Sequence, residues 1–226
     1  MKVEKNSANK AKQHTVYKNK ANKRVPGTTT ITGVLDKPAL KFWANKLGLE
    51  GIKVKEYVDD LASIGTLAHY MIECHVKNDI PNLDDYSKNQ ISSAETSFLK
   101  YLEWEKSVDI KYVGSELQLV SEKYQYGGTI DILAEINGVL TLVDIKTCKA
   151  LYPDQDLQVG GGYFPLLIEN GYDVKQAVIV RVGRSEAEGL NAEYKVINNL
   201  EGFQNLFYLC KKIYDLKKEL NYKASY

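Results

Sequence analysis

The sequence predicts an α/β (α+β) domain in which a central mixed β-sheet is flanked by helices on both faces. Three observations favour this fold class. Residues 37–106 hold three segments with apolar residues at helical spacing, residues 111–146 hold three strand-like runs, and residues 154–220 alternate between helical and strand-like segments. Mixed order of this kind is typical of a layered domain built on one sheet.

Three helices are expected before the sheet, at residues 37–47, residues 54–76 and the segment that follows Ser87. Each carries apolar residues three and four positions apart, which line one face of a helix. Ser87 and Gln90 match a capping box, in which each side chain binds the main-chain N–H of the other residue. The preceding run at residues 25–32 is expected to be a short β segment or a loop.

The pair Asn137-Gly138 separates two apolar runs, residues 128–136 and residues 139–146. Asn-Gly between apolar runs is the strongest short-range signal for a two-residue β-hairpin loop. The other expected elements are a strand at residues 112–120, a stretch of ambiguous start at 154–170 that is helical at its end, strands at 175–182 and 192–197, and an amphipathic helix at 200–220.

The hairpin brings two carboxylates together. In its register Asp131 lies directly opposite Asp144, and Lys146 projects from the same face because side chains alternate along a strand. Opposed Cβ atoms are about 4.5 to 5.5 Å apart, where like charges are destabilising. A divalent hard cation would offset the repulsion, since carboxylate oxygens are its preferred ligands. The alternative is an edge hairpin with a solvated polar face, which the apolar residues on both faces disfavour.

Other side chains could join this site. Glu116 lies in the strand before the hairpin and can approach the carboxylates if the two strands are neighbours. His69 and Glu73 are four residues apart on one predicted helix and therefore share a side. Gly65, one turn earlier, would let another backbone come close. Taken alone, Glu116 fits a solvent-facing strand residue, and His69 with Glu73 fits a surface hydrogen-bonding pair.

Three consecutive glycines, Gly160 to Gly162, lie between Gln158 and Tyr163. A phosphate-binding loop is disfavoured here, because the run has no Gly-Lys-Ser/Thr ending and no strand leads directly into it. The alternative is a flexible or close-packed start of a helix.

Length, composition and charge describe a single-domain protein with a basic start. The 226 residues are 44% hydrophobic, which allows one sizeable core, and the net charge is +1. Residues 1–24 are strongly basic, with seven lysines and Arg24 against Glu4. This segment is expected to be a flexible arm that contacts phosphates, or else a solvated terminus.

No run of 18 apolar residues and no signal peptide is present, so a soluble, cytoplasmic protein without a membrane partner is expected. The three cysteines, Cys74, Cys148 and Cys210, are far apart and suggest neither a disulfide framework nor a zinc knuckle.

Five short motifs follow one another in a characteristic order: Gly65-Thr-Leu-Ala-His69, Glu116, Gly128-Thr-Ile-Asp131, Asp144-Ile-Lys146-Thr147, and Gln158 followed by Tyr163. Together they resemble the PD-(D/E)xK nuclease superfamily. The most similar branch is the RecB-like exonucleases, which include phage exonucleases and the mitochondrial genome maintenance exonuclease. Residues 25–43 also resemble the amino-terminal stretch of such proteins. The resemblance implies a restriction-endonuclease-like core and a single nuclease domain at residues 25–226.

The resemblance also implies roles. Asp131 and Asp144 would bind Mg²⁺ or Mn²⁺, with the Ile145 carbonyl and His69 as further ligands. Lys146 would orient or activate the attacking water. The supporting residues would be the helper carboxylate Glu116, together with Glu73, Gln158, Tyr163 and Thr147, which would support the site or contact nucleic acid.

The implied function is a prokaryotic or phage-encoded DNA nuclease, foremost an exonuclease acting on ends or single strands, with a possible single-strand annealing or replication protein as partner. A structure-selective endonuclease and a catalytically inactive nucleic-acid-binding module are the alternatives. Two departures from the family stand out. Four residues rather than three separate Gln158 from Tyr163, and three scattered cysteines cannot supply four ligands, so no iron-sulfur cluster is predicted.

Overall fold

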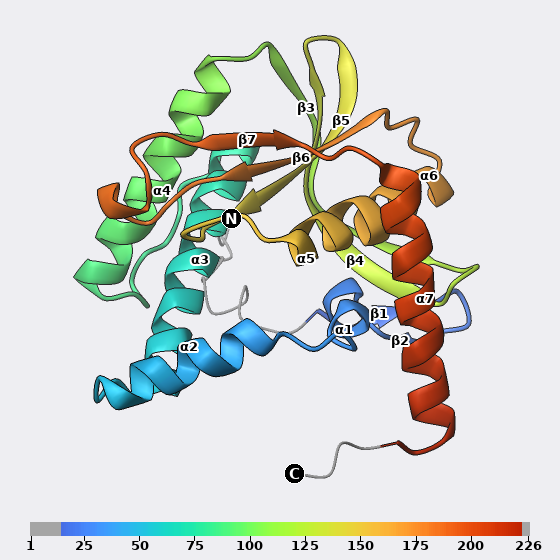
Figure 1. The fold of residues 1–226 in the computed structure, drawn as a ribbon. Helices are drawn as coiled ribbons and strands as arrows, with labels where there is room; N and C mark the ends of the chain where they lie inside the picture. Colours follow the sequence, from blue (N-terminus) through green and yellow to red (C-terminus); the bar gives the residue numbers. More distant parts are fainter. Residues whose placement is uncertain (1–14, 223–226) are drawn as a thin grey trace, which may run out of the picture.

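A computed structural model describes residues 15–222 of the chain. Its centre is a five-stranded sheet in the order β3-β4-β5-β6-β7, in which β5 and β6 are parallel and the other neighbours are antiparallel (Figure 1). The mixed sheet with helices on both faces confirms the predicted fold class. The strands are β3 (Ile110–Ser121), β4 (Tyr126–Ile136), β5 (Val139–Lys146), β6 (Gln176–Arg181) and β7 (Glu193–Val196).

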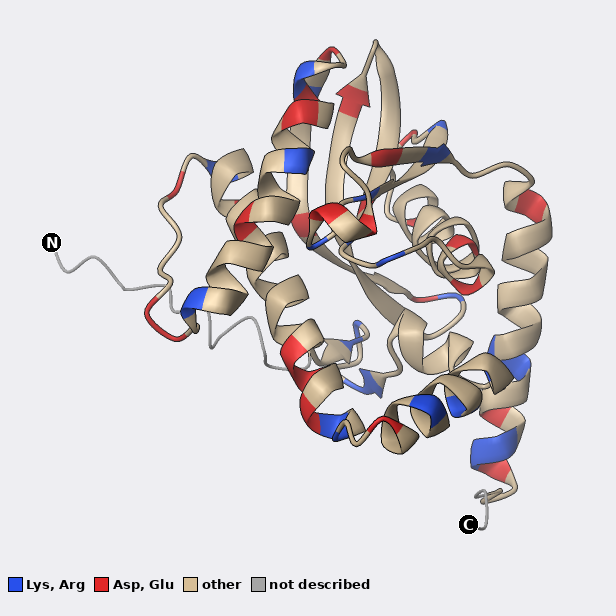
Figure 2. Cartoon of the chain, turned by 60° about the vertical axis from the view of Figure 1, so that its left-hand side comes forward, with Lys and Arg blue, Asp and Glu red and all other residues tan. Residues whose placement is uncertain are grey.

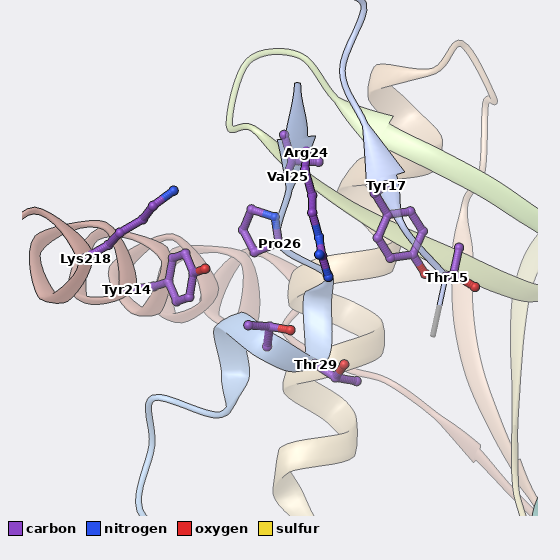
Figure 3. Close-up of a pocket in the computed structure, with 10 residues that line it drawn as sticks. Thr15, Tyr17, Arg24, Val25, Pro26, Thr29, Tyr214 and Lys218 are labelled. Atoms are coloured by element: carbon purple, nitrogen blue, oxygen red, sulfur yellow. The ribbon is translucent and has the colours of Figure 1, made fainter. Parts of the chain in front are cut away.

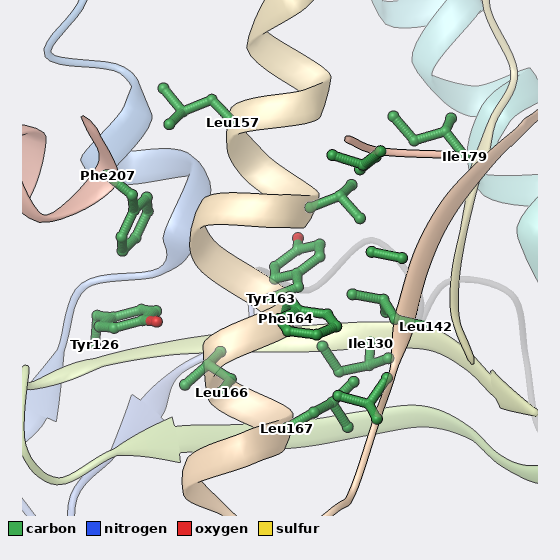
Figure 4. Close-up of a cluster of buried hydrophobic side chains, with 14 of the residues drawn as sticks. Tyr126, Ile130, Leu142, Leu157, Tyr163, Phe164, Leu166, Leu167, Ile179 and Phe207 are labelled. Carbon is green, nitrogen blue, oxygen red and sulfur yellow. The ribbon is translucent and has the colours of Figure 1, made fainter. Parts of the chain in front are cut away.

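Two helical layers cover the sheet. Helices α3 (Val54–Lys77) and α4 (Lys88–Lys106) contribute to a buried cluster on one face, which includes Ile72, Tyr101, Val143 and Val178. The other face lies under a continuous helical stretch and α7 (Leu200–Glu219), around Leu142, Tyr163, Leu166 and Phe207 (Figure 4). That stretch consists of α5 (Pro153–Asp156), the π-helix η2 (Leu157–Tyr163) and α6 (Phe164–Glu169).

Two local predictions before the sheet have different outcomes. The capping box of α4 is confirmed, since the Ser87 hydroxyl accepts a 3.3 Å hydrogen bond from the Gln90 N–H, and the Gln90 side chain accepts one of 3.1 Å from the Ser87 N–H. The prediction of only a β segment or a loop at residues 25–32 is wrong, because this run ends strand β2 (Arg24–Val25) and then forms a short helix, α1 (Thr28–Thr32). Helix α2 (Pro38–Leu49) follows.

The Asn137-Gly138 hairpin is confirmed. Ile136 pairs with Val139, and both loop residues have positive φ, 50° and 78°, as a type I′ turn requires. The ladder between β4 and β5 runs as far as Ile132 and Val143 and stops there. The predicted pairing of Asp131 with Asp144 is therefore not part of the ladder, because the strands separate one residue before it.

The amino-terminal boundary also differs from the prediction. Residues 1–14 lie outside the described part, but strand β1 (Tyr17–Lys18) pairs with β2 and the hairpin packs on the sheet. A Cβ at Gly127 would stand 2.4 Å from the Tyr17 ring, so the absent side chain leaves the space that this ring fills. Residues 17–24, which fall within the predicted flexible arm, thus include strand β1 and the start of β2.

Helix α7 extends beyond the sheet (Figure 1). Phe207 and Cys210 on its apolar side are buried, whereas Ile213 and Leu216, further along the helix, are 44% and 54% exposed. Within residues 15–222 no helix combines the length and the apolar character needed to cross a bilayer.

Candidate metal centre

The centre is built where strands β3 and β4 are irregular. Glu116 has φ of 51°, the left-handed region that non-glycine residues rarely adopt. It lies between the pairs Ser115 with Ile132 and Leu117 with Ile130, opposite Asp131. Such a backbone conformation is costly and is typical of functional sites, where it aims a side chain. Here it brings Glu116 towards Asp131 rather than leaving it on a regular strand.

Three side chains converge at this point. His69, Glu116 and Asp131 each offer one ligand atom, and these atoms all lie within 4.8 Å of one another. His69 comes from α3, and its Nδ1 is 3.6 Å from Oδ2 of Asp131. Glu73 lines the same small pocket one helical turn later, where its carboxylate forms an ion pair with Lys77. The structure therefore unites His69 and Glu116 with one of the two hairpin acids.

Asp131 is held by the main chain of the next strand. Its Oδ2 accepts a 2.8 Å hydrogen bond from the N–H of Ile145, one strand over. A side-chain carboxylate thus takes up an N–H at the point where the β4–β5 ladder has ended. This contact fixes one oxygen of Asp131 beside β5.

Asp144 occupies a different environment. Its side chain is buried, and Lys146 Nζ lies 2.6 Å from its Oδ2. Burial raises the pKa of Asp144 to about 6, although Lys146 opposes the rise. Burial works to lower the pKa of Lys146, but the carboxylates of Asp144 and Asp131 outweigh it and raise that pKa. The predicted ligand Asp144 therefore stands outside the three-residue group, paired with Lys146.

The surroundings of Glu116 disfavour the ionised form of its carboxyl group. Burial, followed by the neighbouring charges of Asp131 and Glu73, raises the pKa of its carboxyl to about 8. A divalent cation between these acids would remove the repulsion and favour the ionised form. Two carboxylates and an imidazole are suitable donors for a divalent cation. The residues at this position therefore fit the metal that the sequence resemblance implies.

Gln158 and Tyr163 meet because their helix is a π-helix. Gln158 Nε2 donates a 2.7 Å hydrogen bond to the Tyr163 hydroxyl. A π-helix repeats its contacts at i and i+5, and these two residues are five apart. The wider turn of the π-helix thus brings Gln158 and Tyr163 together, although four residues separate them.

Tyr163 also links this helix to the carboxylates. A Cβ at Gly128 would lie 2.7 Å from its ring, so the glycine of the Gly128-Thr-Ile-Asp131 motif allows the ring to pack on β4. Burial raises the pKa of Tyr163 well above its ordinary value, and the charges of Asp144 and Asp131 add to the shift. Both acids therefore disfavour ionisation of the Tyr163 hydroxyl.

At Gly65 and in the run Gly160 to Gly162, the absence of a side chain allows another group to pack closely. At Gly65 the close neighbour is a side chain rather than the expected backbone, since a Cβ there would be 2.8 Å from Oγ1 of Thr147. In the triple-glycine run, a Cβ at Gly161 would be 2.5 Å from the carbonyl oxygen of Phe203. The run is a close-packed contact with α7, which confirms the alternative to a phosphate-binding loop.

Sequence reasoning missed Tyr17. Its hydroxyl shares a 2.8 Å hydrogen bond with Thr129, two residues before Asp131. Burial raises the pKa of Tyr17, and the charges of Glu116 and Asp131 contribute. The signal was hidden because Tyr17 lies inside the basic arm, although the adjacent glycines Gly127 and Gly128 could have indicated rings packed on this strand.

Comparisons with known proteins add little to this geometry. No model of a known protein family matches the chain, and no curated protein matches it either. Among solved structures, a protein designated SSO0001 is similar over 69% of this chain and 74% of its own length, with 16% identity and a TM-score of 0.32. An alkaline exonuclease from Laribacter hongkongensis is similar over 71% of this chain and 90% of its own length, with 13% identity and a TM-score of 0.33. At these TM-scores neither similarity carries an argument about function.

Proposed function

We propose that this protein is a metal-dependent nuclease that hydrolyses phosphodiester bonds in DNA with Mg²⁺ or Mn²⁺, as an exonuclease on ends or single strands. One observation carries the proposal: His69, Glu116 and Asp131 converge on one point, and the ion pair of Asp144 and Lys146 lies beside them. A bound cation supplies a more acidic water and polarises the phosphoryl oxygen.

The residues of the site have different roles in metal binding and in stabilising the phosphate charge. His69, Glu116 and Asp131 would hold the cation, and the Ile145 N–H fixes the orientation of Asp131. Asp144 is the fourth candidate ligand: Lys146 contacts its Oδ2, and its second carboxylate oxygen could bind the cation. Lys146 remains protonated because Asp144 and Asp131 raise its pKa, so it orients water and offsets phosphate charge rather than acting as a base.

Two alternatives use the same site. A structure-selective endonuclease would need no change in the residues described. A catalytically inactive nucleic-acid-binding module is disfavoured, because a protein that only binds has no use for a strained Glu116 beside Asp131 and a buried Asp144 paired with Lys146.

End-labelled linear DNA and closed circular DNA, each incubated with Mg²⁺ or Mn²⁺, test the proposal. Loss of linear DNA alone supports an exonuclease, and nicking of circles supports an endonuclease. The Asp131→Asn variant should abolish cleavage, whereas Asp173→Asn, at an exposed aspartate paired with Lys175, should not. Binding without any cleavage by the wild-type protein would contradict the nuclease proposal.

A further inference from the structure

We propose that the groove between the β1–β2 hairpin and α7 binds the backbone and bases of a single-stranded nucleic acid and leads it to the metal centre. We name it the hairpin groove. It has a volume of about 540 Å³, and its lining includes Arg24, Thr29, Thr30, Tyr17, Tyr214 and Lys218 (Figure 3). The proposal deepens the proposed function and rests on it for the reaction that follows binding.

The charge of the hairpin groove is positive and is not neutralised within the groove. Arg24 comes from β2 and Lys218 from the last turns of α7, so the two cations stand on different walls (Figure 3). The lining contains no aspartate or glutamate, and no described carboxylate lies within 4.0 Å of either cation. Unpaired cations in a groove are the usual contacts for backbone phosphates.

The same charge continues along the protein surface. A second, shallower pocket shares Thr30, Tyr214 and Lys218 with the hairpin groove and adds Lys217 and Tyr222. In Figure 2 basic and acidic segments alternate along the carboxyl-terminal part of α7, and the basic residues of this part that line the second pocket are Lys217 and Lys218. A path longer than one pocket is what an extended strand requires, whereas a small anion needs only one contact point.

Hydroxyl groups and aromatic rings complete the lining. Thr29 and Thr30 expose their side chains on α1, where hydroxyls can donate to phosphate oxygens. Tyr17 and Tyr214 present rings from opposite sides of the groove (Figure 3). Aromatic rings stack on bases only when these are unpaired, so the lining favours single strands over a duplex.

Tyr17 connects the hairpin groove to the metal centre. Its ring lines the groove, while its hydroxyl bonds to Thr129, two residues before Asp131 on β4. A strand lying in the groove would therefore pass the ring of Tyr17 before it reaches the carboxylates.

The test is the binding of a fluorescein-labelled oligothymidylate in EDTA, followed by anisotropy over a series of salt concentrations. The double variant Arg24→Ala/Lys218→Ala should bind at least about tenfold more weakly, and the slope of log K against log salt should fall by about 0.7 for each lost contact. The control Lys175→Ala/Lys212→Ala removes the same charge at exposed positions outside the groove and should keep the wild-type slope.

A second variant tests stacking. Tyr214→Leu removes the ring and should weaken binding without changing the salt slope, because it leaves the phosphate contacts in place. If Arg24→Ala/Lys218→Ala keeps the wild-type affinity and slope, the hairpin groove is not the binding site. The same conclusion follows if the control pair loses as much affinity as the groove pair.

These results separate the two proposals. If the wild-type protein cleaves DNA and the groove variant keeps its KM, only the groove proposal fails. If the protein cleaves no DNA with any metal but its binding depends on Arg24 and Lys218, the nuclease proposal fails and the groove proposal stands.

Discussion

The Gln158 amide donates a 2.7 Å hydrogen bond to the hydroxyl of Tyr163, five residues further along a π-helix. In an α-helix residues five apart do not share a face, so this contact depends on the wider turn. A double-mutant cycle with Gln158→Leu and Tyr163→Phe should give a coupling free energy of about 1 kcal/mol. Additive changes in the free energy of unfolding would show that the two side chains do not interact.

The close packing of Gly161 against α7 predicts a stability loss. In Gly161→Ala the new Cβ would meet the carbonyl oxygen of Phe203 at 2.5 Å, a main-chain atom that cannot move away alone. The free energy of unfolding should fall by about 1 to 3 kcal/mol. Gly48→Ala, in α2 with no atom within 4 Å of its Cβ, should instead gain up to about 1 kcal/mol. Chemical denaturation measures both, and equal effects would refute the packing explanation.

The raised pKa of Glu116 predicts how pH affects the metal-free protein. Its folded pKa of about 8 lies above its ordinary value of 4.5, so the folded state binds the proton more tightly than the unfolded state. This stabilisation is complete below the ordinary value and is lost as pH rises through about 8. In EDTA, Tm should therefore fall between pH 5 and pH 9 more in the wild type than in Glu116→Gln. If the Tm of the wild type and of Glu116→Gln changed equally with pH, the raised pKa of Glu116 would be contradicted.

The Lys146→Met variant tests whether Lys146 is needed for cleavage but not for metal binding. Lys146 contacts Asp144 and is not one of the three clustered ligands, so the variant should still bind Mn²⁺ while cleavage falls by about a hundredfold or more. Removing one partner of a buried ion pair can cost about 3 to 5 kcal/mol, so circular dichroism must first show that the variant is folded. Cleavage at the wild-type rate by the folded variant would exclude a role for Lys146.

Much of this fold could be predicted from local signals. The Asn137-Gly138 turn determined the register of β4 and β5 as far as Ile132, and the capping box at Ser87 marked the start of α4. These features are encoded by a few neighbouring residues, so pattern and turn chemistry are sufficient.

The parts that escaped prediction depend on distant contacts. The separation of β4 from β5 at Asp131 is linked to a hydrogen bond from Ile145 and to the left-handed backbone of Glu116, for which a glutamate gives no signal. Tyr17 joins the site only through the packing of the amino-terminal hairpin on Gly127. The resemblance suggested His69 as a candidate ligand, but it did not indicate that Asp144 would pair with Lys146 outside the cluster.

Calorimetric titration with Mn²⁺ is the most direct test of the metal centre. The wild-type protein should bind Mn²⁺, and His69→Ala, Glu116→Gln and Asp131→Asn should each lose most of that affinity, because each removes one ligand of the cluster. The control Asp173→Asn should bind as the wild type does. Undiminished Mn²⁺ binding by Asp131→Asn and Glu116→Gln would contradict the proposed centre.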